Sequence, residues 1–243
     1  MEYPRYKKPQ VKVFLFILAV FVSWIWSPMR FFWDQIDLTL AKLFNAMLIH
    51  STLWQNFVIF SNSRTADWLY DFVMIALLAF AYKKARTIDL STLILAVTLV
   101  SCIHIGHYKF VSRRFIHETL EYKRNSPSLT LENYVSIHEL RPDVKTKDRS
   151  NHSFPADHGF TCALFISTIF ILFGRRFALL ALVFSLTHMM ARVFIGAHWM
   201  TDILIGSTLL ALFYNSILFY TPVFGMIRRS HRDKGSQKSV SRS

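Results

Sequence analysis

The sequence predicts an all-α, polytopic membrane protein, a bundle of about six transmembrane helices. Of its 243 residues, 53% are hydrophobic and 16% aromatic, and the mean hydropathy of +0.31 exceeds that of ordinary soluble domains. The apolar residues gather in runs approaching the length needed to cross about 30 Å of hydrocarbon. Short clusters of Lys and Arg separate these runs, as they do at the faces of a bilayer.

The first predicted span covers residues 11–26 and follows a basic cluster made of Arg5, Lys7, Lys8 and Lys12. No small-residue cleavage site follows this run, and an aromatic belt comes next, so we interpret it as a membrane helix and not a signal peptide. The belt consists of Trp24, Trp26, Phe31, Phe32 and Trp33. From 36 to 48 apolar residues recur at helical spacing, while Asp37, Lys42 and Asn45 fall elsewhere. This pattern predicts an amphipathic helix lying in the interface on the outer side.

Five further spans are predicted at residues 68–82, 90–105, 160–173, 177–190 and 203–219. Two of the spans are short, so totals of five or seven remain open. With six spans the basic clusters all fall on one side, which the positive-inside rule makes cytoplasmic together with both termini. Segments 27–67, 106–158 and 191–202 then face outward. We expect residues 1–226 to form a single transmembrane domain and the basic tail, 227–243, to be a disordered cytoplasmic extension.

The formal charge of +13 could indicate nucleic acid binding. However, the Lys and Arg residues lie in clusters between apolar runs and not along one amphipathic face, so no nucleic acid partner is expected. Cys102 and Cys162 both fall in or near apolar runs. They therefore predict small apolar packing residues and not a disulfide framework.

One outward block, residues 145–159, ends at His158 and Gly159 and leads directly into an apolar helix. The start of a helix presents unpaired backbone N–H groups and the positive end of the helix dipole. His158 is therefore expected where a phosphate would bind.

A second outward block contains Arg192, His198 and Asp202. Asp202 follows His198 by four residues, so it can face the imidazole, hold one nitrogen and leave the other free to attack phosphorus. The guanidinium of Arg192 supplies a fork for two phosphoryl oxygens. A third block, 117–127, places Lys123 and Arg124 on the outer side against the positive-inside bias, and binding of an anionic substrate would explain them.

These blocks resemble the type 2 phosphatidic acid phosphatase (PAP2) superfamily, whose pattern is Lys-x6-Arg-Pro, Pro-Ser-Gly-His and Ser-Arg-x5-His-x3-Asp. Arg192, His198 and Asp202 match the third signature, with Ala191 in place of Ser. The second signature matches at Pro155 and His158, where Ala156 and Asp157 replace Ser and Gly. In the first signature Arg124 matches, but His117 and Asn125 stand in the Lys and Pro positions, and Lys123 is the candidate replacement cation.

At the positions where the chain departs from the superfamily signatures, its residues resemble those of one branch, the lipid A 1-diphosphate synthases. The resemblance covers segments 123–130, 146–148, 153–159 and 192–202, as well as Phe44, Asn45, Asn62 and Arg64. It implies transfer of a phosphate from undecaprenyl diphosphate to the 1-phosphate of lipid A, on the periplasmic side of the Gram-negative inner membrane. Domain 1–226 would then be catalytic, and both partners would be membrane lipids.

The residues then have predicted roles, and no metal or cofactor is expected. His198 is the nucleophile, Asp202 orients it, and His158 protonates the leaving oxygen. Arg124, Arg192 and Lys123 bind the phosphate, and Asp157, His117 and Ser153 are possible accessory residues.

Other interpretations remain open at the level of sequence. The same residues would serve a lipid phosphatase, or a transporter whose Arg and His line a pathway, although the broken helices or inverted repeats of a transporter are not evident. Asp148, Glu118 and Glu121 are interpreted as solvated loop charges, with Mg²⁺ binding together with Asp157 as the alternative. His104, His107 and His188 are interpreted as hydrogen-bonded packing residues. The oligomeric state is not predicted.

Overall fold

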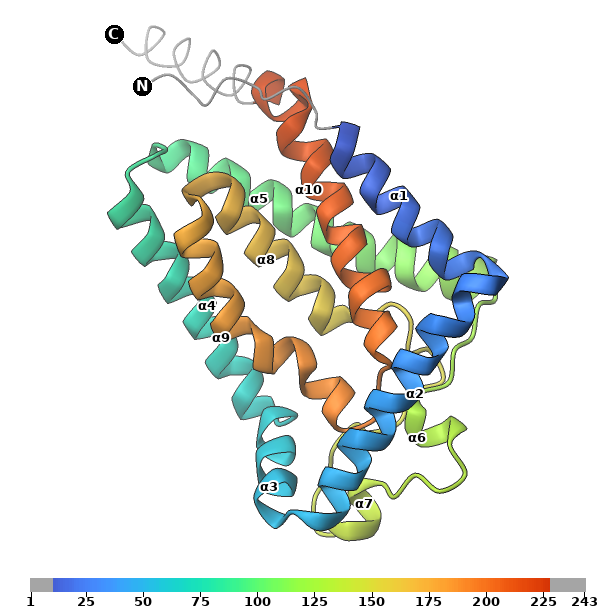
Figure 1. Cartoon of the computed structure of the whole chain (residues 1–243). Coiled ribbons are helices and arrows are strands. Elements are labelled where there is room, and N and C mark those ends of the chain that lie inside the picture. The colour runs from blue at the N-terminus through green and yellow to red at the C-terminus, as the bar shows by residue number, and fades with distance from the viewer. Residues whose placement is uncertain (1–10, 228–243) are drawn as a thin grey trace, which may run out of the picture.

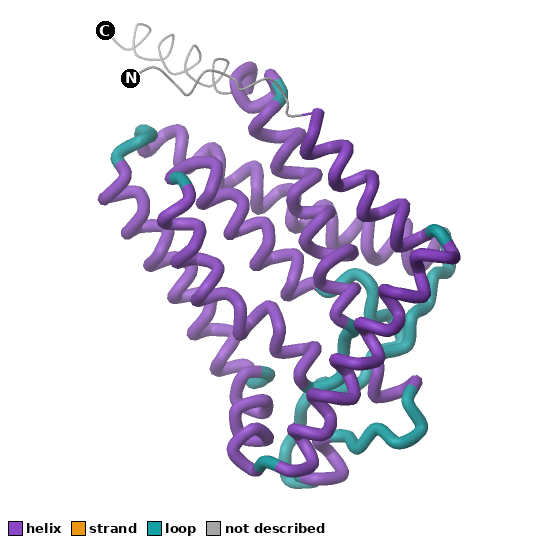
Figure 2. The backbone as a smooth tube through the Cα atoms, in the orientation of Figure 1, coloured by secondary structure: helices purple, strands orange, loops and turns teal. Residues whose placement is uncertain are grey.

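A computed structural model describes residues 11–227, and its regular elements in that part of the chain are all helices (Figures 1 and 2). The longer helices are α1 (Val11–Ile25), α2 (Ser27–His50), α3 (Thr52–Ser61), α4 (Arg64–Ala85), α5 (Leu90–Gly106), α8 (Asp157–Phe173), α9 (Arg175–Phe194) and α10 (Leu210–Tyr220). Two π-helical segments, η1 (His107–Thr119) and η2 (Asp202–Leu209), adjoin α5 and α10, and α6 (Pro127–Thr130) and α7 (Ile137–Leu140) are single turns. The all-α prediction is confirmed.

Four helical stretches of the described part are long and apolar enough to cross a membrane: Arg64–Ala85, Leu90–Thr119, Arg175–Phe194 and Asp202–Tyr220. The pair α1 and α2 would make a fifth. The remaining predicted span corresponds to α8, whose 17 residues rise only about 25 Å. By length and composition, four or five of the six predicted spans are long enough to cross a membrane, and α8 is the shorter one.

The outer faces of these helices carry large apolar side chains, as a lipid environment requires. Trp68 and Phe72 of α4 are 72% and 69% exposed, and Val183 of α9 is 68% exposed. Such residues would be costly in water, where extended apolar patches favour association. Their exposure supports the prediction of a membrane protein.

Helix α2 differs from the predicted interfacial helix at 36–48, because it begins at Ser27 and runs for 24 residues. Pro28 lies in its first turn, where the missing N–H of proline is tolerated, and the chain bends by 86° between α1 and α2. The side chains that α2 buries are Asp37, Ala41, Asn45 and Leu48. Asp37 and Asn45 therefore face the protein, and the bend places α2 beside the loops between η1 and α8 (Figure 1).

Helix α8 is the centre of the bundle and contacts α4, α5, α9, α10 and η2. Gly159 permits its close approach to η2, since a Cβ there would lie 2.9 Å from Ser207 Oγ. Further along, Asn215 of α10 donates to Ser167 Oγ at 2.7 Å and to Thr168 Oγ1 at 3.0 Å. Such interhelical hydrogen bonds hold helices together where the surrounding solvent is itself apolar.

The described basic residues of the predicted cytoplasmic clusters lie at one end of the bundle. Lys83 and Lys84 are in the last turn of α4, and Arg175 and Arg176 begin α9. The turns after α4 and α8 lie at the same end as the start of α1 and the end of α10 (Figure 1). The clusters at 5–8 and 228–234, and nearly all of the predicted tail, lie outside the described residues. Cys102 is exposed and Cys162 buried, and both are free.

Candidate active site

The three sequence blocks meet at the ends of the helices opposite the basic turns. Segment 124–126 runs beside segment 150–153: Ser153 N donates to the Arg124 carbonyl and Ser126 N to the Ser150 carbonyl, both at 2.9 Å. The block that contains Arg192 and Asp202 approaches through His198, whose ring Nδ1 lies 2.5 Å from the carbonyl oxygen of Ser153. Backbone pairing thus joins block 117–127 to block 145–159, and the His198 contact joins the remaining block to them.

The chain between α9 and η2 makes a tight turn that presents His198. Gly196 has a φ of +82°, a conformation that glycine adopts without strain. A side chain at Gly196 would also collide with the ring of Tyr134. After this glycine, the backbone N–H groups of Ala197 and His198 both donate to the carbonyl of Arg192, at 2.9 and 3.1 Å.

The contacts of His198 determine which of its nitrogens is free. A carbonyl oxygen only accepts hydrogen bonds, so Nδ1 must carry the proton that is directed at Ser153. Asp202 Oδ2 lies 3.6 Å from the same nitrogen. In the neutral ring Nε2 is then the nitrogen with an available lone pair, as a nucleophile requires. The closest partner of Nδ1 is thus a backbone carbonyl, which the spacing of His198 and Asp202 did not reveal.

Asp202 is fully buried and is fixed by donors from two other sites. Its Oδ2 accepts from the backbone N–H of Trp199 at 2.8 Å, and its Oδ1 pairs with Arg124 Nη1. The guanidinium of Arg124 also reaches Asp37, with Nη2 2.6 Å from Asp37 Oδ2. Arg124 therefore bridges two buried carboxylates from α2 and η2.

Thr201 completes this bridge. Its backbone N–H and its hydroxyl donate to Asp37 at 2.9 and 2.6 Å, and Arg124 Nη1 donates to the same hydroxyl at 2.8 Å. Burial by itself lowers the pKa of Arg124, but the carboxylates of Asp202 and Asp37 outweigh it, so the pKa is raised. The guanidinium is thus charged and committed to protein partners. A direct phosphate contact by Arg124 stays a prediction, and these bonds support a positioning role for it.

Asp37 should be needed to hold this bridge, although it lies on a different helix from His198. We expect Asp37→Asn to lower the free energy of unfolding by about 3–5 kcal/mol, because it leaves a buried charge incompletely paired. In the folded fraction it should lower kcat by about 100-fold through displacement of Asp202 and His198, while KM changes little. Thermal unfolding and steady-state kinetics of the purified variant measure both effects.

Asp34→Asn is the matched control, one turn earlier on α2. Asp34 pairs with Arg30 at 2.8 Å, and its side chain is 53% exposed, so its loss should change stability by less than about 1 kcal/mol. If Asp37→Asn matches this control in both measurements, the bridge does not position the site.

His158 lies in the first turn of α8, as predicted, with a side chain that is 29% exposed. Its Nε2 is 3.6 Å from Asp67 Oδ1, which belongs to the first turn of α4. Arg192, Lys147 and His198 all lie close enough to act electrostatically on its ring. The structure therefore brings His158, His198 and Arg192 to one place and adds Lys147.

Sequence reasoning did not select Lys147, Asp37 or Thr201. Lys147 is exposed, and its carbonyl accepts from Arg192 Nη1 at 3.3 Å. The available signal for Lys147 was its place in the outward block before His158. For Asp37 it was the spacing of four and eight residues from Ala41 and Asn45, which puts the three on one face of the helix.

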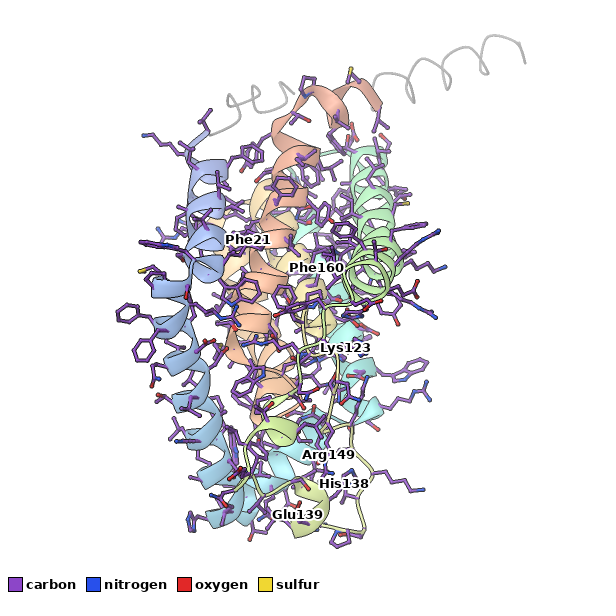
Figure 3. The ribbon with its side chains drawn as sticks, turned by 90° about the vertical axis from the view of Figure 1, so that its right-hand side faces the viewer. Phe21, Lys123, His138, Glu139, Arg149 and Phe160 are labelled. Carbon is purple, nitrogen blue, oxygen red and sulfur yellow. The ribbon has the colours of Figure 1, made fainter. Side chains whose placement is uncertain are left out.

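The other predicted residues are placed around this centre. His117 Nε2 lies 2.9 Å from the carbonyl of Phe154, beside the Ser153 turn. Asp157 lies close enough to interact electrostatically with His198 and Lys147. Lys123 is exposed on the loop after η1 (Figure 3) and lines a cavity of about 510 Å³ that Asp34 and Asp37 also line. Lys123 acts electrostatically on His152, whereas Arg192 and Lys147 act on His158.

Ser153 contributes its backbone carbonyl to the site. Its hydroxyl is buried, and it has no hydrogen-bond partner within residues 11–227.

One prediction about isolated charges needs correction. Asp148 was expected to be a solvated loop charge, but it is 2% exposed, and its Oδ1 lies 3.5 Å from His138 Nε2. Its loop contacts α7, where the carbonyl of Thr146 lies 3.0 Å from His138 Nε2 and Arg149 lies 3.5 Å from Glu139. Glu118 and Glu121 are exposed, as expected, and Glu118 lies 3.3 Å from Arg113.

The three packing histidines differ in their contacts. His104 is hydrogen-bonded as predicted, with Nε2 2.9 Å from Thr161 Oγ1. His107 stacks on Phe160 at a centroid distance of 3.8 Å, and within the described chain neither of its ring nitrogens has a hydrogen-bond partner. His188 packs against Tyr70, with ring centroids 4.3 Å apart. The prediction of hydrogen bonding was therefore wrong for His107, where ring stacking takes its place.

Comparison with known proteins identifies the family of the chain. A PAP2 superfamily model matches residues 122–224, which contain Arg124, His158, Arg192, His198 and Asp202. The lipid A 1-diphosphate synthase of Escherichia coli (strain K12) is 32% identical over 211 residues, which cover 85% of this chain and 84% of that protein. No solved structure matches the chain. The chain belongs to the PAP2 superfamily and is a membrane enzyme of that type.

Proposed function

We propose that this enzyme transfers a phosphate from undecaprenyl diphosphate to the 1-phosphate of lipid A. The proposal is supported by the similarity to a lipid A 1-diphosphate synthase. The single structural observation that carries it is the hydrogen bond from His198 Nδ1 to Ser153, because it leaves Nε2 as a nucleophile. Hydrolysis of the same lipid, with water as acceptor, is the alternative.

The reaction proceeds in two displacements at phosphorus. His198 Nε2 attacks the terminal phosphorus of the donor, the bond to the bridging oxygen breaks, and His158 gives a proton to that oxygen as undecaprenyl phosphate leaves. An oxygen of the lipid A 1-phosphate then attacks the phosphohistidine, the N–P bond breaks, and His158 takes back any proton that the acceptor releases. The positive charge that develops on His198 is stabilised by Asp202, 3.6 Å from Nδ1.

Phosphoryl transfer depends mainly on positioning and on neutralising the charge of the transferred group. Arg192 and Lys147 both act electrostatically on His158, and we assign phosphate binding to them. Arg124 holds Asp202, which orients His198, through their ion pair. Because its guanidinium is paired with carboxylates, it is not a free cation for the phosphate. Lys123 is assigned no role in the transfer step.

Arg192→Lys should be a damaging change although it preserves the charge. The guanidinium fork binds two phosphoryl oxygens at once, and a point charge cannot reproduce this geometry. We expect kcat/KM to fall by about tenfold or more, equivalent to the loss of one charged hydrogen bond of about 1.5–3 kcal/mol. Lys147→Arg should be tolerated much better, because it extends the donor set. Wild-type kinetics in Arg192→Lys would exclude bidentate binding.

An apolar crevice beside the site suits the chain of a polyprenyl lipid. A cavity of about 530 Å³ lies among α4, α5 and α8, and apolar side chains make up most of its lining. Thr161 and His104 belong to this lining, and Thr161 donates to the carbonyl of Asp157 at 3.1 Å. A lipid chain in this crevice would bring its diphosphate to the start of α8, where His158 lies.

The acceptor is tested by following the fate of the transferred phosphate. Purified enzyme is incubated with undecaprenyl diphosphate labelled on its terminal phosphate, with and without lipid A 1-phosphate. We expect the label on lipid A whenever lipid A is supplied. If the label appears only as inorganic phosphate under both conditions, the enzyme is a phosphatase.

We also propose that the site faces the periplasm of a Gram-negative bacterium, with both termini in the cytoplasm. Single cysteines at Asn151 and at Arg175 would report the two faces after replacement of Cys102 and Cys162. In intact spheroplasts an impermeant thiol reagent should label position 151 and leave position 175 unmodified. The opposite labelling would place the site in the cytoplasm and exclude a periplasmic donor.

A further inference from the structure

Three metal-ligating side chains from three helices meet beside the proposed general acid. They are Asp67 of α4, His158 of α8 and His188 of α9, whose ligand atoms all lie within 4.8 Å of one another. Asp67 Oδ1 lies 3.6 Å from His158 Nε2 and 4.0 Å from His188 Nδ1. These separations are longer than hydrogen bonds, so the three donors are gathered without being bonded to one another.

His188 gives an independent indication that the cluster lacks a partner. Its side chain is only 7% exposed, and its Nδ1 has no hydrogen-bond partner in the described part of the chain. Leaving a buried polar group unpaired costs about 1–3 kcal/mol. The mechanism above does not use this nitrogen, although it lies at the edge of the catalytic site and 4.0 Å from a carboxylate.

We propose that Asp67, His158 and His188 form an inhibitory binding site for Zn²⁺. Two imidazoles and one carboxylate form a ligand set that suits Zn²⁺, whereas Mg²⁺ and Ca²⁺ prefer oxygen ligands. Tetrahedral bonds of about 2.0–2.2 Å place neighbouring ligand atoms about 3.3 Å apart, so the cluster must contract slightly around the ion. Asp67 and His158 are 38% and 29% exposed, which gives them room to move and gives the ion a path of entry.

Occupation of this site would remove the general acid. A metal ion takes the lone pair of a neutral imidazole, and a ring bound in this way does not accept a further proton for delivery to the leaving oxygen. The first displacement would then lack its proton donor. The inhibition rests on the proposed role of His158, whereas the binding of the ion does not.

Metal binding is measured first, without turnover, on the full-length protein after removal of any affinity tag. Co²⁺ is the spectroscopic probe, and Zn²⁺ is the competitor. Wild-type protein should give the visible absorbance of tetrahedral Co²⁺, and one equivalent of Zn²⁺ should abolish it. His188→Gln should give no such absorbance, and His50→Gln, at the exposed end of α2, should behave as wild type. Asp67→Asn provides a second ligand variant if His188→Gln does not fold.

Inhibition is then measured with the phosphate-transfer assay. Zn²⁺ should lower wild-type turnover by at least about tenfold, the lower end of the usual contribution of general acid catalysis, and EDTA should restore it. His188→Gln should keep its basal activity, and its half-inhibitory Zn²⁺ concentration should rise by more than about 100-fold, since loss of an outer partner alone costs about 10- to 100-fold.

Absence of a tetrahedral Co²⁺ spectrum in wild type would overturn the metal site, whatever reaction the enzyme performs. Equal Zn²⁺ sensitivity of wild type and His188→Gln would overturn the assignment of the inhibitory ion to this cluster. If transfer to lipid A fails but the Co²⁺ spectrum depends on His188, the proposed function is wrong and the metal site stands.

Discussion

Replacement of His198 by alanine should abolish formation of the phosphoenzyme. The variant lacks the Nε2 lone pair, and neither Asp202 nor the Ser153 carbonyl can take its place as an attacking group for phosphorus. We expect kcat to fall by about 10⁴-fold or more, as when a nucleophile is removed from a coupled catalytic group. Acid-labile, alkali-stable phosphate on the protein, together with steady-state rates, provides the measurement.

His138→Ala is a suitable control for this result. His138 lies in α7 and contacts the carbonyl of Thr146 at 3.0 Å, and Figure 3 places it toward the end of the molecule. Its removal should leave the phosphoenzyme in place. Near-normal turnover in His198→Ala, or acid-labile phosphate on a different residue, would exclude His198 as the nucleophile.

His158→Ala should lower kcat by about 10²-fold to 10⁴-fold, the usual contribution of a general acid. The size of the loss should depend on the leaving group, because a good leaving group departs without a proton. We therefore expect a large defect with a lipid diphosphate and a much smaller one with an aryl phosphate that carries an activated phenol. Rates for both substrates, in the variant and in wild type, are compared.

A defect of equal size for both leaving groups would show that His158 binds phosphate and does not protonate the leaving oxygen. Lys147→Ala serves as the comparison, because Lys147 lies near His158 and is assigned to phosphate binding. It should affect the two substrates alike. The ratio of the two defects separates proton transfer from electrostatic binding.

The helices that could be predicted were those with long apolar runs. Residues 68–82 and 177–190 fall within α4 and α9, because a bilayer requires about 20 apolar residues whatever the tertiary contacts are. The helical segment at 107–119 belongs to the predicted outward segment 106–158, for which no helix was predicted. It continues α5 although it is polar. The resulting 30-residue helix, Leu90–Thr119, starts with the expected span at 90–105 and extends beyond it.

The site could be predicted only where a motif is local. His198 and Asp202 are four residues apart, so their proximity follows from spacing. The role of the Ser153 carbonyl could not be predicted, because backbone groups carry no sequence signal. Asp37 was missed because its partners, Arg124 and Thr201, lie 87 and 164 residues away in the chain, and a polar residue on an amphipathic helix is ordinarily expected to face water.

Transfer of phosphate through His198 is tested most directly by a chase of the phosphoenzyme. Enzyme is labelled with undecaprenyl diphosphate, separated from excess donor and mixed with lipid A 1-phosphate or with buffer. The label should leave His198 rapidly and appear on lipid A, and it should leave far more slowly in buffer. Loss of label as inorganic phosphate at the same rate in both mixtures would contradict the transferase, and an enzyme that never acquires label at His198 would contradict the mechanism.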